Sequence, residues 1–167
     1  LKRFQNKKIM IDFVDELEES SLKSKAVNTV YKVEDKIVGA NTDGIGFISS
    51  LQRDLNFPFD SKTNVMCIGA GGAAYGIVSS LIDFNPQIIK IINRTNSTGI
   101  KLIKHFKKFM GSKKTFEADL MGCNPDHEID LLINCTSCGM NGKNPLDIDL
   151  SSMNKKSLVY DLVYEPT

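Results

Sequence analysis

The chain has 167 residues, 41% of them hydrophobic and 25% charged, a composition typical of one soluble globular domain with a small extra lobe. A net charge of +1 argues against nucleic acid as the main partner, because binding to a phosphate backbone requires a clear cationic excess. No apolar run is long enough to span a bilayer and no leader pattern opens the sequence, so we expect a cytoplasmic protein.

Short elements are expected before a break near Pro58, a residue that tends to end helices. They are the end of a helix at residues 9–17, two strands at 26–33 and 37–40, and a helix at 44–56.

Beyond Pro58, strands and helices alternate along the chain. The expected strands are residues 65–68, 88–93, 129–134 and 157–163, and the expected helices are residues 72–84 and about 97–110. Strands that alternate with helices form parallel sheets, because the crossover helices cover the sheet. We therefore predict an α/β fold with a Rossmann-like parallel sheet and helices on both faces.

A glycine cluster follows the first of these strands. In residues 64–78 (NVMCIGAGGAAYGIV), Gly69, Gly71 and Ala74 fit the pattern G-x-G-x-x-[G/A] between a strand and a helix. Gly69 permits the sharp turn, Gly71 lets a pyrophosphate approach the backbone, and Ala74 lets the helix pack close to the strand. The free N–H groups at the helix N-terminus suit phosphate, so nucleotide binding is favoured over a plain turn.

The end of the next strand indicates which nucleotide is bound. Sites for NAD usually have an acidic residue there that binds the ribose hydroxyls, whereas this chain has Asn93, Arg94 and Thr95. An arginine can pair with the 2′-phosphate that distinguishes NADP, and an acid would repel it. The sequence therefore predicts NADP, with a surface arginine at a strand end as the alternative.

Four cysteines are present, at positions 67, 123, 135 and 138. Cys135 and Cys138 have the C-x-x-C spacing, but a structural zinc site needs a second pair, and Cys67 and Cys123 lie far apart in the sequence. We expect reduced thiols and no metal.

Together, these residues make the chain resemble the shikimate dehydrogenase family. Six segments carry the resemblance, in the family's order: Ala26-Val27-Asn28-Thr29, Asn41-Thr42-Asp43-Gly44, Gly69-Ala70-Gly71-Gly72-Ala73-Ala74, Asn93-Arg94-Thr95, Asn134-Cys135-Thr136-Ser137-Cys138-Gly139-Met140 and Tyr160-Asp161-Leu162-Val163-Tyr164-Glu165-Pro166.

The resemblance implies the reversible, NADP-dependent reduction of 3-dehydroshikimate to shikimate, a step of aromatic amino acid biosynthesis. It implies that Asp43 is catalytic and that Asn28, Asp43 and Tyr164 bind the substrate. The cofactor-binding residues that it implies are Gly69, Ala70, Gly71, Gly72, Ala73, Asn93, Arg94, Thr95, Thr136, Ser137, Met140 and Leu162. It also implies a domain boundary, with residues 1–44 the remnant of a substrate-binding domain and residues 45–167 the NADP-binding domain.

The resemblance is weaker at both ends of the chain. Lys7 is the preferred match to the family's catalytic lysine, because it has the usual spacing before Asp15-Glu16-Leu17, and Lys2 is the alternative. The family's carboxylate-binding serine pair should precede residue 1, and its C-terminal helix should follow Thr167. The 167 residues alone can bind NADP and still fail to turn over.

Several alternatives stay open. The chain can be a non-catalytic NADP-binding module, or a quinate/shikimate dehydrogenase that uses NAD. Read alone, Asn41-Thr42-Asp43-Gly44 is also a helix-capping sequence. Monomer and homodimer are both compatible with the sequence.

Overall fold

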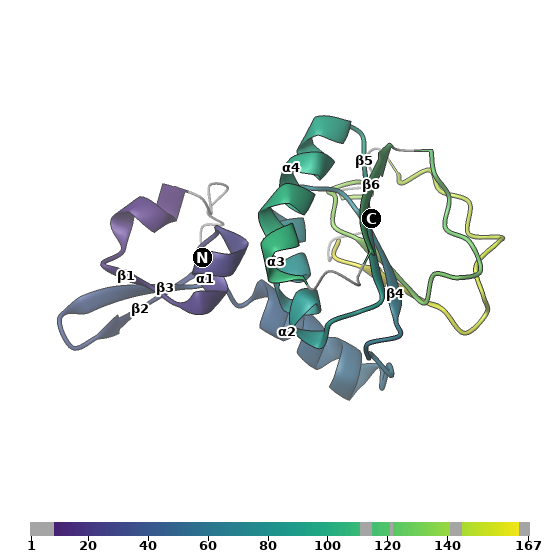
Figure 1. Ribbon diagram of the computed structural model, residues 1–167. Coiled ribbons are helices and arrows are strands. Elements are labelled where there is room, and N and C mark those ends of the chain that lie inside the picture. Colours follow the sequence, from purple (N-terminus) through teal and green to yellow (C-terminus); the bar gives the residue numbers. More distant parts are fainter. Residues whose placement is uncertain (1–8, 111–114, 121, 141–144, 164–167) are drawn as a thin grey trace.

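The computed structural model describes residues 9–110, 115–120, 122–140 and 145–163 (Figure 1). Its helical segments are η1 (Ile9–Phe13), α1 (Glu19–Ser24), α2 (Asp43–Ser49), the π-helical turn η2 (Ser50–Asp54), α3 (Gly72–Leu81), η3 (Ile82–Phe84), α4 (Asn96–Phe106) and η4 (Lys107–Phe109). Its strands are β1 (Glu16–Leu17), β2 (Thr29–Val33), β3 (Lys36–Ala40), β4 (Asn64–Ile68), β5 (Ile88–Asn93), β6 (Thr115–Leu120), β7 (Leu131–Asn134) and β8 (Leu158–Asp161).

The strands form two sheets, as Figure 1 shows. The small sheet has the order β1-β3-β2, in which β2 and β3 form the expected antiparallel hairpin and Glu34 takes a positive φ of 53° in the turn. The expected helix end at residues 9–17 is instead the 3₁₀ turn η1 followed by β1.

The large sheet has the order β6-β5-β4-β7-β8, with every neighbouring pair parallel. This confirms the predicted α/β class and parallel sheet. The chain moves outward from β4 to β5 and β6, and then returns to β7 on the other side of β4. Such a reversal creates a crevice at the carboxyl ends of the two central strands, where ligands bind in folds of this kind.

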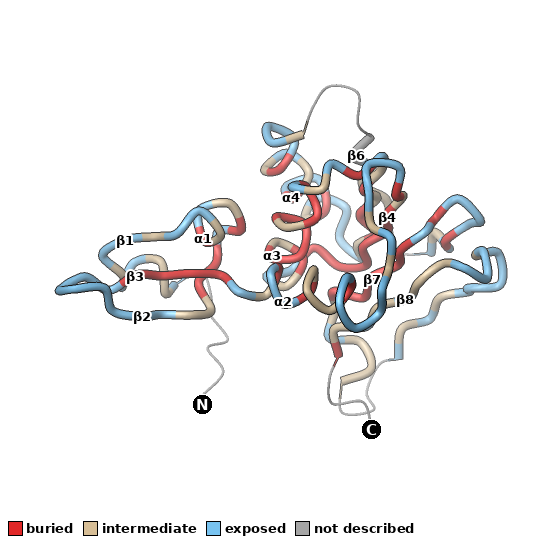
Figure 2. Tube along the Cα trace, turned by 90° about the horizontal axis from the view of Figure 1, so that it is seen from below, coloured by how far each residue is buried: buried red, intermediate tan, exposed pale blue. Residues whose placement is uncertain are grey.

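Helices cover one face of this sheet among the residues that the structure describes. The core there includes Val65, Cys67, Ile89, Ile91, Leu131 and Ile133 from the sheet, and Phe47, Ile77, Leu81, Leu102 and Phe106 from α2, α3 and α4. The opposite face carries a smaller cluster around Met66, Ile68, Ile92 and Leu132, against which Leu146, Ile148 and Met153 pack from a segment without helix. Helices on both faces, which the sequence predicts, are therefore not found within the described ranges. Figure 2 colours each residue by its burial, and the buried residues, in red, are concentrated where the helices pack on the large sheet.

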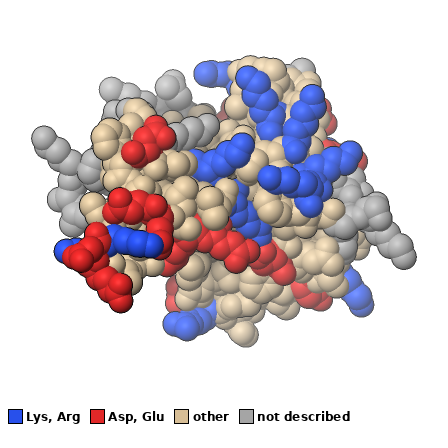
Figure 3. All heavy atoms as spheres, turned by 60° about the vertical axis from the view of Figure 1, so that its left-hand side comes forward, with Lys and Arg blue, Asp and Glu red and all other residues tan. Residues whose placement is uncertain are grey.

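The small sheet is joined to the larger part through α1 and α2. Lys23 of α1 pairs with Asp83, and the Nε2 atom of His105 on α4 lies 2.8 Å from the Lys23 carbonyl oxygen. In the view of Figure 3, basic side chains gather over one region of the surface and acidic side chains gather over a separate region. Helices α4 and η4 contribute lysines to this protein's basic side chains. None of the helices in the described ranges could cross a bilayer.

Candidate functional site: a glycine loop and a carboxylate at neighbouring helix ends

The glycine loop begins where β4 ends. Gly69 has a φ of 101°, which favours glycine, and its N–H donates to the Ile92 carbonyl 2.7 Å away. A Cβ at Gly69 would lie 2.9 Å from Cγ2 of Thr136 and 3.2 Å from the carbonyl carbon of Cys135. The absence of a side chain therefore lets the loop after β4 and the loop after β7 approach each other.

The N-terminus of α3 lies open beyond this loop. Gly71 is the N-cap residue, with extended backbone, and a Cβ added to Gly71 or Gly72 would meet nothing within 4 Å. Ala74, one turn further on, is fully buried, as expected where a helix packs closely on a strand. The unpaired N–H groups and the positive end of the helix dipole suit an anion such as a pyrophosphate.

Asn93 links this loop to the end of β5. Its Oδ1 accepts a hydrogen bond from the Ala70 N–H at 3.2 Å, and its Nδ2 donates to the Thr95 carbonyl at 2.7 Å. The carboxamide therefore holds the two segments in register. Arg94, between them, is exposed and follows the strand next to β4.

The loop after β7 lies next to the glycine loop, at the end of the other central strand. Thr136 donates its N–H and its hydroxyl to Oδ1 of Asn134, at 3.0 and 2.6 Å, and its Oγ1 accepts the Cys138 N–H at 3.0 Å. The Met140 N–H donates to the Ser137 carbonyl at 3.1 Å. Thr136, Ser137 and Met140 therefore belong to one internally bonded turn.

The loop after β8 lies beside this turn, because the N–H of Leu162 donates to the Asn134 carbonyl at 3.2 Å. Asn134 itself and its neighbour Asp161 were not predicted as site residues, although both end strands of the sheet at the crevice. Their position at the ends of two predicted strands was the sequence feature that could have identified them as site residues.

A second group of polar side chains surrounds Asp43 at the start of α2. Asn28 donates from Nδ2 to Oδ1 of Asp43 at 2.6 Å, and Oδ1 of Asn28 accepts the Thr42 N–H at 3.0 Å. The N–H of Asp43 donates to Oδ1 of Asn41 at 3.1 Å, so Asn41, which precedes the N-cap residue Thr42, accepts the first N–H of this helix. The structure therefore brings the predicted residues Asn28 and Asp43 into direct contact.

This group lies near the crevice because α2 packs against α3. Gly76 faces Asp43, and it lies four residues after Gly72, the first residue of α3. At a rise of about 1.5 Å per residue, Asp43 is level with a point about one helical turn from the N-terminus of α3. The three other predicted residues, Lys7, Lys2 and Tyr164, lie outside the described residues.

The buried thiols of Cys67 and Cys135 lie together in the core beneath the crevice. The pKa of Cys135 is raised well above the usual thiol value, first by its hydrogen bond with Cys67 and then by burial. All four cysteines are free, and the described residues contain no group of three histidine, cysteine, aspartate or glutamate side chains that could hold a metal.

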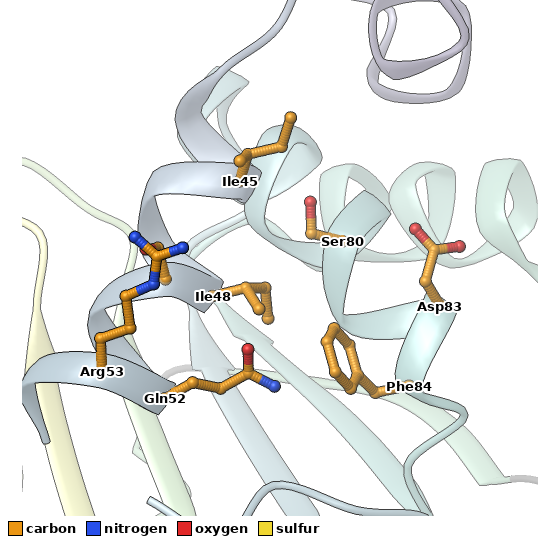
Figure 4. Close-up of a pocket in the computed structure, with 8 residues that line it drawn as sticks. Ile45, Ile48, Gln52, Arg53, Ser80, Asp83 and Phe84 are labelled. Atoms are coloured by element: carbon orange, nitrogen blue, oxygen red, sulfur yellow. The ribbon is translucent and has the colours of Figure 1, made fainter. Parts of the chain in front are cut away.

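A cavity of about 300 Å³ lies elsewhere, between α2 with η2 on one side and α3 with η3 on the other (Figure 4). Ile48, Gln52 and Arg53 line one wall, and Ser80, Asp83 and Phe84 line the other. None of the predicted site residues lines it, so it is separate from the crevice.

Comparison with known proteins supports this picture. No model of a protein family matches the chain. The NADP(+) shikimate dehydrogenase of Hydrogenovibrio crunogenus is 37% identical over 158 residues, which are 93% of this chain and 55% of the relative.

Two solved structures have the same fold. The ligand-free 5-ketofructose reductase of Gluconobacter sp. strain CHM43 is 31% identical, with a TM-score of 0.84 over 96% of this chain and 57% of the other. The shikimate 5-dehydrogenase of Thermus thermophilus, in complex with NADP(H) and shikimate, is 25% identical, with a TM-score of 0.79 over 98% of this chain and 57% of the other. Over nearly all of its length the chain is thus similar in sequence and fold to the shikimate dehydrogenases, and it spans about half the length of the curated relatives that it matches.

Proposed function

We propose that the chain binds NADP in the crevice between β4 and β7 and forms part of a shikimate dehydrogenase. The observation that carries the proposal is the open N-terminus of α3, with Arg94 at the end of the neighbouring strand β5. The N-terminus of α3 would stabilise a pyrophosphate, and Arg94 would stabilise a 2′-phosphate, at the ends of two neighbouring strands. The contacts among the glycine loop, residues 93–95 and the loop after β7 support the proposal that these predicted cofactor residues form one site.

The proposed reaction is reversible transfer of hydride between NADPH and the ketone carbon of 3-dehydroshikimate. The bound cofactor supplies the hydride. Asn28 orients the carboxylate of Asp43 through the 2.6 Å hydrogen bond. Asp43 can therefore accept a hydrogen bond from the reacting hydroxyl of the substrate. The developing oxygen charge needs a nearby cation or proton donor, and Lys7, with Lys2 as the alternative, is the predicted residue. Tyr164 is predicted to contact the same substrate.

The named activity of the Hydrogenovibrio relative and the ligands of the Thermus structure support this choice of reaction. A second candidate is reduction of a neutral ketosugar, favoured by the 5-ketofructose reductase, whose identity and TM-score are higher than those of the Thermus structure. Both reactions reduce a ketone that has a hydroxyl on a neighbouring carbon, and the carboxylate of the substrate distinguishes them. Residues 1–44 are proposed as the substrate side and residues 45–167 as the NADP side, in a cytoplasmic enzyme.

Titration of the purified chain with NADPH and NADH, followed by nucleotide fluorescence, tests the cofactor. We expect NADPH to bind at least about tenfold more tightly, because one charge-assisted contact of Arg94 has that magnitude. Equal or tighter binding of NADH would favour the NAD-dependent alternative, and binding of neither would refute the site. Oxidation of shikimate, and not of a neutral polyol such as fructose, with NADP then tests the substrate. The turnover assay is run on the full-length parent protein beside this chain, because the chain spans about half the length of its relatives. Binding without turnover of either substrate by the parent protein identifies the non-catalytic module.

A further inference from the structure

Asn134 and Asp161 end neighbouring parallel strands and lie directly opposite each other in the sheet register. Side chains alternate along a strand, so both point away from the face that α2, α3 and α4 cover, because their neighbours Ile133 and Tyr160 belong to the core of that face. Nδ2 of Asn134 lies 2.9 Å from Oδ1 of Asp161. Asn134 is only 5% exposed, so its polar atoms need partners within the protein.

The carboxylate determines how the asparagine is oriented. An ionised carboxylate only accepts hydrogen bonds, so the NH₂ group of Asn134 must face Asp161. Oδ1 of Asn134 then faces Thr136 and accepts both its N–H, at 3.0 Å, and its hydroxyl, at 2.6 Å. Because the Thr136 hydroxyl donates its proton to Asn134, its oxygen is left to accept the Cys138 N–H at 3.0 Å.

The same pair also holds the loop that follows β8. Oδ1 of Asp161 accepts the Val163 N–H at 2.9 Å, and the Asn134 carbonyl accepts the Leu162 N–H at 3.2 Å. One chain of hydrogen bonds therefore runs from Asp161 through Asn134 and Thr136 to Cys138. Connected bonds of this kind strengthen one another, so the two loops are held as one unit.

These two loops lie on the side of the crevice where we expect the nicotinamide half of the dinucleotide. If Arg94 binds the 2′-phosphate beyond β5 and α3 binds the pyrophosphate beside β4, the rest of an extended dinucleotide must continue past β7 and β8. We propose that Asn134 and Asp161 are positioning residues, which contact neither cofactor nor substrate and shape the nicotinamide side of the crevice. This inference rests on the proposed NADP site and extends it.

Exchanging the two side chains tests the proposal. Asn134→Asp places two carboxylates opposite each other, and we expect it to weaken NADP binding by about tenfold. Asp161→Asn keeps an oxygen for the Val163 N–H and is expected to have a smaller effect. The double variant Asn134→Asp/Asp161→Asn restores the bond between the two side chains and both bonds from Thr136, since the carboxylate introduced at position 134 can accept from Thr136 and from the new amide. It gives up only the bond from the Val163 N–H, because the new NH₂ group takes the place of the oxygen that accepts it.

Each variant is titrated with NADP and with 2′-phospho-ADP-ribose, which lacks the nicotinamide. We expect Asn134→Asp to change the affinity for the fragment by less than about twofold, and the double variant to recover NADP affinity to within about threefold. The control is Asp126→Asn, because Asp126 accepts the Glu128 N–H at 2.9 Å in the same way, and it precedes β7 at the other end of the strand.

The outcomes separate this inference from the proposed function. If the unmodified chain binds neither ligand, the NADP site itself is wrong. If the unmodified chain binds both, the positioning role is refuted by equal losses for NADP and the fragment in Asn134→Asp, or by failure of the double variant to recover. Equal losses would indicate a general effect on stability, which thermal unfolding of the same samples would detect.

Discussion

Gly76 of α3 faces Asp43 of α2 so closely that a Cβ at position 76 would lie 3.2 Å from Cβ of Asp43. The crossing of these two helices therefore sets the distance between the Asp43 carboxylate and the N-terminus of α3, which is the end that suits a phosphate. Gly44 takes part in the same crossing, because a Cβ there would lie 2.7 Å from the Gly76 carbonyl oxygen and would also overlap the Ser80 hydroxyl.

Gly44→Ala is expected to destabilise the protein by about 1–3 kcal/mol, because the Gly76 carbonyl belongs to the backbone and cannot rotate away. The measurement is the free energy of unfolding in urea. Gly46→Ala is the matched control, since it lies in the same helix and its added Cβ meets nothing within 4 Å. It should be neutral or stabilising by up to about 1 kcal/mol. Equal unfolding free energies for the two variants would contradict the close crossing.

Arg94→Ala should weaken NADP binding by about tenfold to a hundredfold and change NAD binding by less than about threefold, because only NADP carries the 2′-phosphate. Fluorescence titration of both nucleotides measures the difference. Lys104→Ala removes the same charge from the exposed side of α4, so it controls for a general electrostatic effect. If both variants lose NADP affinity equally, Arg94 makes no specific contact.

Asp43→Asn removes the carboxylate charge and keeps an oxygen that Asn28 can donate to. In the full-length parent protein, we expect shikimate oxidation to fall by about 10²–10⁴, typical of the loss of a group that assists proton transfer. NADP affinity should stay within about twofold, since Asp43 is proposed to act on the substrate and not on the cofactor. The appearance of NADPH absorbance measures turnover, and Asp54→Asn, on the exposed η2, is the control. Full activity of Asp43→Asn would refute the catalytic assignment.

His105 should make stability depend on pH. Burial lowers the pKa of this imidazole below its ordinary value of 6.5, and the charges of Lys25 and Lys108 act in the same direction, although its hydrogen bond to the Lys23 carbonyl opposes them. The unfolded chain therefore binds a proton at higher pH than the folded one does. The stability that His105 contributes is present above about pH 6.5 and is lost as the pH falls through the folded pKa.

His105→Gln tests this, because glutamine can still donate to the Lys23 carbonyl and does not titrate. Unfolding free energies are measured for both proteins at about pH 7.5 and about pH 5.5. The unmodified chain should lose more stability on acidification than the variant does. An identical loss in the two proteins would mean that His105 does not couple folding to pH.

The four cysteines should react with iodoacetamide at different rates, because the thiolate is the reactive form. Cys138 is half-buried in its loop and should react first. Cys123 should follow, because its hydrogen bond with Asp119 raises its thiol pKa. Cys67 and Cys135 are buried and should react only after unfolding. Mass spectrometry of timed samples gives the order, and early labelling of Cys135 would contradict the buried pair.

Local patterns predicted much of the fold. β4, β5, α3 and α4 lie within one to four residues of their predicted ends, because long apolar runs and glycine punctuation are local signals. β6 was not predicted, although Phe116, Ala118 and Leu120 alternate with polar residues as in a strand. The segment contains two acidic residues and follows a lysine-rich stretch, a composition that is typical of a solvent-exposed loop. The cover of the second sheet face was also not predicted, since it consists of segments without any periodic pattern.

The sequence by itself determined the α/β class, the glycine loop at the end of β4 and the residue types around it, because these depend on neighbours a few positions apart. Only the tertiary structure decided that Asn28 holds Asp43, that Asn93 joins two loops and that Asn134 is oriented by Asp161. Those contacts join residues 15 to 27 positions apart, and they form because parallel strands and packed helices bring such positions together.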